Sequence, residues 1–165
     1  MLTRLFQRVD AALDMLALAA LTLASAMLAV LIVIFSWLVF GRYVLNATPT
    51  WVEQLSLLLV VWITFLGAAA GVRHHRHLAV DFIREAMPGP VRMTLTVYAL
   101  LALGLFGAVM VWQGWIMYER TATRIVPLLG VSEGWRAIPV ILSGGMIAVF
   151  CADDLIKLTL QRFRD

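Results

Sequence analysis

The residue types and spacings closest to a reactive site lie in one short basic run. His74, His77 and Asp81 would share one face of a helix, where residues three and four apart are neighbours. Imidazole and carboxylate groups bind zinc, so this spacing allows a metal site. Arg73 and Arg76 stand among them, and their charge repels cations and attracts anionic lipid headgroups. We therefore favour headgroup contact, or pairing of His77 with Asp81, over metal binding. The predicted membrane-anchoring residues are Arg73, Arg76, His77 and Asp81.

A carboxylate stands at the other end of the same apolar stretch. Thr50 and Glu53 have the spacing of a capping box, which satisfies the free backbone N–H groups of a helix's first turn. A second, compatible interpretation is that Glu53, beside Trp51, contacts a partner subunit or pairs with Arg42. Neither interpretation involves a reaction, and we predict no catalytic residue and no enzymatic activity.

The composition identifies the elements that must carry these residues. Of the 165 residues, 62% are hydrophobic and 14% are charged, whereas a soluble domain has about half and a quarter. The sequence therefore predicts a membrane protein. Its net charge of +3 is small, and its arginines gather at the ends of apolar runs, which argues against a nucleic-acid partner. The single cysteine, Cys151, excludes a disulfide framework and a cysteine metal site.

The apolar runs predict an all-α protein with four transmembrane helices in one domain, residues 1–165. The expected spans are residues 15–40, 52–72, 93–118 and 138–152, the last one ending at Asp153 and Asp154. The first run is much longer than the apolar core of a signal peptide, so we expect it to be retained. Apolar stripes in residues 1–14 and around 78–87 predict short amphipathic helices at the membrane surface. Residues 1–14 could also be the first turns of the first span, and we favour an interfacial start that bends into the membrane.

Four spans place both termini on the same side of the membrane. Nine of the 13 basic residues then lie on the terminal side, which the positive-inside rule makes cytoplasmic. These nine are Arg4, Arg8, Arg73, Arg76, Arg84, Arg92, Lys157, Arg162 and Arg164. The sequence thus predicts a multi-pass protein of a bacterial inner membrane with both termini in the cytoplasm.

The interiors of the four spans contain no Asp, Glu, Lys, Arg or His. Transporters keep ionisable residues or broken helices near the midplane, so a stand-alone small transporter is disfavoured, although Gly144 and Gly145 could permit a break. A redox anchor that holds haem b is the other alternative. It needs imidazoles on facing helices, but all three histidines lie in one connector. We expect no cofactor.

Small residues in the second span predict a close helix contact. Gly67 and Gly71 form a GxxxG strip, which lets another helix approach. That helix could belong to this chain or to another protein, and Trp62 in mid-span favours a protein contact. The candidate interface residues are Arg42, Trp51, Glu53, Trp62, Gly67 and Gly71.

These residues carry a resemblance to a known family. The positions concerned are Arg42, Tyr43, Trp51, Glu53, Gln54, Leu55, Trp62, Phe65, Leu66, Gly67, Arg73, His77, Val80 and Asp81. In this order they resemble the small membrane subunit of tripartite ATP-independent periplasmic (TRAP) transporters, the DctQ-like type. Gln54 stands where that family often has a second acid.

The resemblance implies an accessory role. In that family a large permease subunit carries the sodium and substrate sites, and a soluble periplasmic protein captures an organic acid. The acid is, for example, a C4-dicarboxylate or a sialic acid. The small subunit scaffolds the large one and helps to dock the binding protein. The expected partners are therefore the large permease subunit, the periplasmic substrate-binding protein and membrane lipids.

Overall fold

The computed structural model describes residues 2–47, 49–74, 89–126 and 129–162. Within these ranges the chain forms four long helices and one short 3-10 turn, with no strand. They are α1 (Leu2–Tyr43), α2 (Trp51–Arg73), α4 (Gly89–Thr121), η1 (Glu133–Arg136) and α5 (Ile138–Arg162). All four long helices are apolar and long enough to cross a membrane. The predicted all-α, four-helix membrane protein is confirmed.

Two of the expected helix boundaries differ from the structure. α1 is continuous from Leu2 to Tyr43, so the predicted surface helix at residues 1–14 is the first part of that helix. α5 continues to Arg162, so the helix is longer than the membrane span expected within it at residues 138–152. The surface helix expected around residues 78–87 lies outside the described residues.

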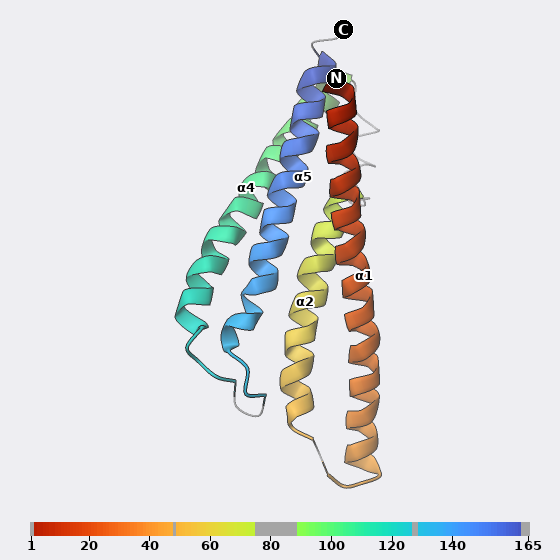
Figure 1. The fold of residues 1–165 in the computed structure, drawn as a ribbon, viewed down its shortest axis with the longest axis vertical. Helices are drawn as coiled ribbons and strands as arrows, with labels where there is room; N and C mark the ends of the chain where they lie inside the picture. Colours follow the sequence, from red (N-terminus) through yellow and green to blue (C-terminus); the bar gives the residue numbers. More distant parts are fainter. Residues whose placement is uncertain (1, 48, 75–88, 127–128, 163–165) are drawn as a thin grey trace.

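The four helices lie side by side in a row rather than around a central axis (Figure 1). α1 packs against α2, α2 against α5, and α5 against α4, which gives the order α1–α2–α5–α4. Both termini lie at one end of the row, which we call the terminus end. The other end, formed by the α1–α2 and α4–η1 connections, is the connector end. The edge helices α1 and α4 are less buried than the central ones. In the most apolar stretch of each helix, 11% of the residues are buried in α1 and in α4, against 28% in α2 and 39% in α5.

The contact between α4 and α5 depends on two glycines. A Cβ atom added to Gly107 would lie 2.7 Å from the carbonyl oxygen of Gly144, and one added to Gly144 would lie 2.7 Å from that of Gly107. Only glycine allows the two backbones to approach so closely. α5 runs through Gly144 and Gly145 without a break. The helix break that these glycines could permit is therefore absent. Gly144 instead allows the close packing of α5 against α4.

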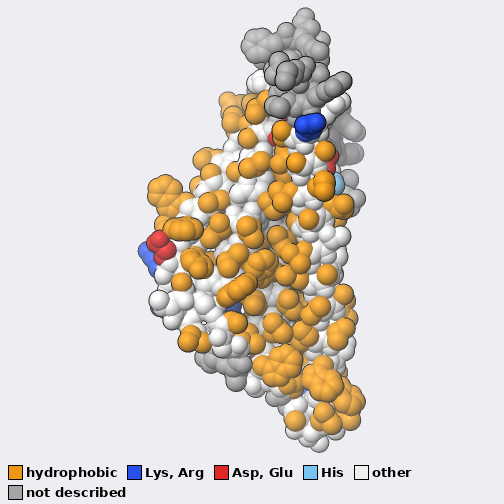
Figure 2. All heavy atoms as spheres, in the orientation of Figure 1, with side chains coloured by type: hydrophobic (Ala, Val, Ile, Leu, Met, Phe, Trp, Pro, Cys, Tyr) orange, Lys and Arg blue, Asp and Glu red, His pale blue; other side chains and the backbone are white. Residues whose placement is uncertain are grey.

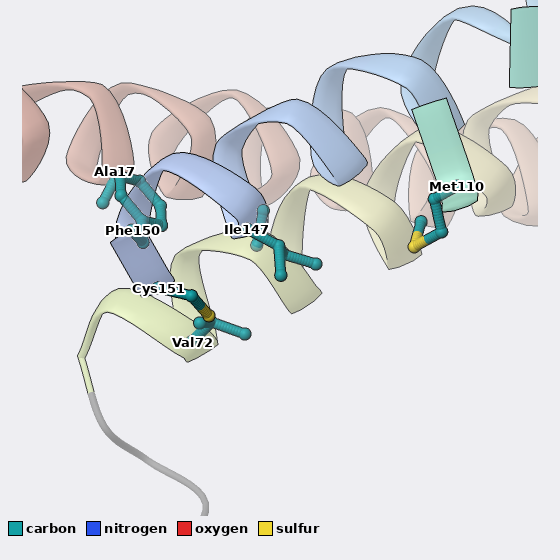
Figure 3. Close-up of a cluster of buried hydrophobic side chains, with 7 residues drawn as sticks. Ala17, Val72, Met110, Ile147, Phe150 and Cys151 are labelled. Carbon is teal, nitrogen blue, oxygen red and sulfur yellow. The ribbon is translucent and has the colours of Figure 1, made fainter. Parts of the chain in front are cut away.

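A hydrophobic cluster joins the two helix pairs (Figure 3). Phe150 and Cys151 of α5 are fully or almost fully buried, at 0% and 1% exposure, and pack with residues from the other three helices. The other buried members are Ala17, Ala69, Val72, Met110 and Ile147. Because burial of apolar side chains against protein does not gain a hydrophobic free energy inside a membrane, this cluster holds the helices through close packing.

The faces of the row are mostly apolar. Figure 2 shows hydrophobic side chains over most of the visible face, with charged side chains near the terminus end and at the edge formed by α4. Large apolar residues of all four helices are exposed, among them Leu105, Phe106 and Trp112 on α4. A membrane or a partner must cover these faces, because soluble monomers rarely expose apolar patches of this size.

Candidate functional site

One arginine at the terminus end connects three helices. Arg73, the last residue of α2, donates hydrogen bonds through Nε to Asp14 Oδ1 (2.8 Å) and through Nη2 to Asp10 Oδ1 (2.9 Å), both on α1. Its Nη1 donates to Asp153 Oδ2 on α5 (2.9 Å) and lies 3.9 Å from Asp154. We call these five residues, together with Lys157, the charge cluster.

Lys157 completes the charge cluster from α5. Its ammonium group lies 2.7 Å from Asp153 Oδ2 and also pairs with Asp10. The cluster thus holds two cations and four carboxylates. The guanidinium group of Arg73 also lies over the ring of Phe150, 5.8 Å from its centroid, in cation–π geometry. The polar cluster and the hydrophobic cluster are therefore continuous.

Burial makes the charge cluster important for the fold. The side chains of Arg73 and Asp153 are 7% and 9% exposed, whereas those of Asp10 and Asp14 are 35% and 62% exposed. A buried charge that loses its partner destabilises a fold by about 3–5 kcal/mol. The cluster therefore fixes α2 against both α1 and α5 at this end.

Arg73 was expected to contact lipid headgroups, whereas in the structure it contacts carboxylates of α1 and α5. Its guanidinium group is directed into the protein and uses its donors on carboxylates, so little of it is left for lipid. His74, the next residue, is exposed. The other predicted anchors, Arg76, His77 and Asp81, lie outside the described residues, as does the proposed His77–Asp81 pair.

The sequence contained a signal for this cluster that the prediction did not use. Asp10 and Asp14 are four residues apart, as are Asp153 and Lys157, so each pair shares one helix face. Carboxylates near the ends of two apolar spans need a cation at the same depth. Arg73 is the basic residue at the end of α2 on that side.

The connector end has a smaller polar contact between the two helix pairs. Arg136 of η1 donates through Nη2 to Gln54 Oε1 of α2 at 3.0 Å, and its Nη1 lies 3.7 Å from Glu133. Gln54 is the residue that departs from the family's frequent acid. The structure gives it a role as a hydrogen-bond acceptor, which its neutral amide can fill.

The predicted capping box at the start of α2 is wrong. Thr50 has αR backbone angles (φ −64°, ψ −22°), and its side chain makes no capping hydrogen bond. An N-cap residue usually has extended angles, which direct its hydroxyl toward the first free N–H groups. Here the N–H group of Val52 donates instead to the carbonyl oxygen of Pro49 at 3.2 Å.

The predicted interface residues at the connector end point outward. Arg42, Trp51 and Glu53 are exposed, and no ion pair joins Glu53 to Arg42, both of which lie in the described part of the chain. The proposed Glu53–Arg42 pair is therefore absent from the structure. These side chains are free to contact a partner, which remains a prediction.

Trp62, Gly67 and Gly71 on α2 have two different environments. Trp62 packs against Leu66 and against Ala20 and Ala24 of α1, inside this chain. A Cβ atom added to Gly67 or Gly71 would meet nothing within 4 Å. Gly67 and Gly71 therefore make no close contact with another helix among the described residues, and their surface is open to a helix of another protein.

The described residues contain no group of three or more His, Cys, Asp or Glu side chains that could hold a metal ion. The hypothetical site at His74, His77 and Asp81 is not covered by this result, because only His74 is described. Chemically, the arrangement can hold helices together at one end and present apolar faces and exposed polar groups to a partner.

The fold and its exposed apolar surfaces define a multi-pass membrane protein. The chain belongs to the family of tripartite ATP-independent periplasmic transporters, DctQ component, whose model matches residues 31–161. That match includes α2, α4, η1 and almost all of α5, and with them Arg73, Asp153 and the Arg136–Gln54 contact, whereas Asp10 and Asp14 of the charge cluster precede it.

Curated relatives agree with this family. The chain is 28% identical over 127 residues to the sialic acid TRAP transporter small permease protein SiaQ of Vibrio cholerae, covering 75% of this chain and 71% of that protein. It is 34% identical over 127 residues to the C4-dicarboxylate TRAP transporter small permease protein DctQ of Pseudomonas aeruginosa, covering 74% and 60%. A 105-residue stretch, 62% of this chain, is 29% identical to 17% of the sialic acid TRAP transporter permease protein SiaT of Haemophilus influenzae.

Proposed function

We propose that this chain is the small permease subunit of a sodium-coupled TRAP transporter that imports an organic acid, either a C4-dicarboxylate or an acid like sialic acid. In this role it scaffolds the large permease subunit in a bacterial inner membrane. It also helps to dock the periplasmic substrate-binding protein, and its termini lie in the cytoplasm.

The observation that carries the proposal is the single row of helices with charges at its ends. The described ionisable residues of α2 and α5 lie near their ends: Glu53 and Arg73 on α2, and residues from Asp153 onward on α5. A transporter binds its ions and substrate at groups near the midplane, and the described middle parts of α2 and α5 contain no charged residue. A row of helices with large exposed apolar residues on all four of them instead suits a brace beside a larger partner.

The relatives support the same role. Two of them are small permease proteins, and the match to part of the SiaT permease protein shows that a segment like this chain occurs within a longer permease polypeptide. A subunit that occurs both alone and joined to a longer permease is expected to sit directly beside it. Sodium coupling and the nature of the acid follow from the family resemblance.

Co-purification with the large permease subunit tests this function. We expect the two chains to purify as one complex, and we expect the charge reversal Glu53→Lys to lower the yield of that complex several-fold, because Glu53 is an exposed carboxylate beside Trp51. The yield of inserted small subunit should not change. Glu119→Lys, the same charge reversal at an exposed carboxylate of α4, is the matched control.

Two outcomes would contradict the proposal. One is a small subunit that purifies alone in the presence of the large one. The other is unchanged uptake of organic acid after deletion of this chain. Uptake by vesicles that contain only this chain would point instead to the stand-alone transporter.

A further inference from the structure

An open hollow lies on α4 at the connector end. It has a volume of about 320 Å³ and is lined by Gln113, Ile116, Met117, Arg120, Thr121 and Arg124. The spacing of the first five places them on one face of the helix over its last turns. Arg124 follows the helix, and its backbone N–H group donates to the carbonyl oxygen of Thr121 at 3.0 Å, which keeps it beside the last turn.

No other helix of the described chain covers this hollow. α5 covers the face of α4 that contains Gly107 and Gly114, where an added Cβ atom would meet Gly144 or Ile141. Trp115 lies on yet another face, and its indole N–H group donates to Glu119 Oε1 at 2.8 Å. The nearby carboxylate of Glu119 is thus already occupied away from the hollow.

The hollow contains two cations without an anion. Arg120 and Arg124 are exposed, and neither takes part in an ion pair among the residues that the structure describes. Basic residues at a helix C-terminus are favourable in any case, because they complement the helix dipole. The helix dipole does not explain why both arginine side chains line one hollow together with the apolar side chains of Ile116 and Met117.

Gln113 supplies a second observation. Its side chain is exposed and makes no hydrogen bond within the described residues, although it lies about 10 Å deeper along α4 than Arg120. An amide without a partner in the hydrocarbon region is costly. Trp115 and Tyr118, whose rings lie 6.2 Å apart, mark the depth of the membrane interface. The two arginines therefore lie at headgroup depth, and Gln113 lies at the level where acyl chains begin.

We propose that this hollow binds one anionic phospholipid. Arg120 and Arg124 donate hydrogen bonds to the headgroup phosphate, and guanidinium groups suit phosphate oxygens because they can bind two at once. Ile116 and Met117 line the first part of an acyl chain. Gln113 donates its amide N–H to an ester carbonyl. A phospholipid carries a phosphate, an ester carbonyl and an acyl chain at the depths of the two arginines, Gln113 and the apolar side chains. An isolated phosphate ion would leave Gln113 without a partner.

Lipid binding to the purified full-length chain tests the proposal. The chain is prepared in mild detergent, phosphatidylglycerol is added, and the fraction with bound lipid is measured by native mass spectrometry. We expect the double variant Arg120→Gln/Arg124→Gln to lower the affinity about thirtyfold, since each arginine near a membrane surface contributes about fivefold to the binding of anionic lipid. Arg120→Lys/Arg124→Lys should restore part of the binding, and Gln113→Leu should cause a smaller loss.

The matched control is Arg42→Gln, which removes an exposed arginine at the same end but outside the hollow. It should bind lipid as the unchanged chain does. Circular dichroism checks that all variants keep their helical content.

The proposal is overturned if the double variant and Arg42→Gln bind phosphatidylglycerol equally well. It is also overturned if inorganic phosphate displaces the lipid at millimolar concentration, which would identify a site for a free anion. If the double variant Arg120→Gln/Arg124→Gln binds lipid normally but no longer binds the large permease subunit, the proposal is also overturned, because the hollow is then a protein contact.

Discussion

The two ends of this helix row are held in different ways. At the terminus end, Arg73 reaches carboxylates on both neighbouring helices through three hydrogen bonds of 2.8–2.9 Å. At the connector end, one hydrogen bond between Arg136 and Gln54 joins the α4–α5 pair to α2, and α1 and α2 extend further than α4 and α5 (Figure 1). The two helix pairs are therefore held together mainly near the termini. At the opposite end they share fewer polar contacts, and charged side chains such as Arg42 and Glu53 are exposed.

The strongest test of this comparison removes the cation at the terminus end. Arg73→Leu leaves the mostly buried carboxylate of Asp153 with one cation fewer, and only the pair of Lys157 with Asp10 then remains as an ionic link between α5 and α1. We expect a loss of about 3 kcal/mol in the free energy of unfolding. Denaturant unfolding of the purified chain in detergent measures it. Arg42→Leu, at an exposed arginine of α1, should change the stability by less than about 0.5 kcal/mol. Equal effects of the two changes would show that the terminus end is not the stronger connection.

A second test separates contacts within one helix pair from contacts between the pairs. Gly144→Ala places a Cβ atom 2.7 Å from the carbonyl oxygen of Gly107, so α4 and α5 must move apart. We expect a loss of about 2 kcal/mol in the same assay. Gly145→Ala adds the same methyl group where nothing lies within 4 Å, and it should be neutral or slightly stabilising because alanine favours helix. A loss of similar size for both would contradict the close glycine contact.

The smallest effect is expected at the connector end. Arg136→Gln removes the donor to Gln54, but the arginine side chain is 25% exposed and water can replace it. The expected loss is about 0.5–1 kcal/mol in the free energy of unfolding. Arg124→Gln, at a basic residue without a described ion pair, is the control and should have no measurable effect on stability. A loss at Arg136 as large as that at Arg73 would make the two ends equivalent.

The sequence was sufficient to predict the helices, because each depends mainly on its own apolar run. The second span was expected at residues 52–72 and α2 spans Trp51–Arg73. Local physics fixes such elements, since a backbone in lipid must satisfy its hydrogen bonds within one segment. The family was also predictable, because the resemblance rests on residues of this same stretch and of the connections around it.

Contacts between helices were less predictable, because they depend on which helices become neighbours. The GxxxG pattern of Gly67 and Gly71 is the clearer one in the sequence, yet the close backbone contact in this chain is made by Gly107 and Gly144. The contacts of Arg73 were unpredictable for the same reason. Its position beside a basic run indicated lipid, and only the arrangement of α1, α2 and α5 places four carboxylates around it. Thr50 failed as a cap for a local reason, because its own backbone angles are helical.

The charge cluster also has a consequence for the order of events during synthesis. A ribosome makes α1 and α2 before α5, so Asp10 and Asp14 meet Arg73 in the membrane while Asp153 and Lys157 have not yet been made. During that interval Arg73 has two carboxylate partners, one of them largely exposed, and the first helix pair is only partly fastened. Insertion of α5 supplies the buried partner and completes the arrangement. α5, which is made after α1 and α2, is therefore the helix that completes the connection among the three.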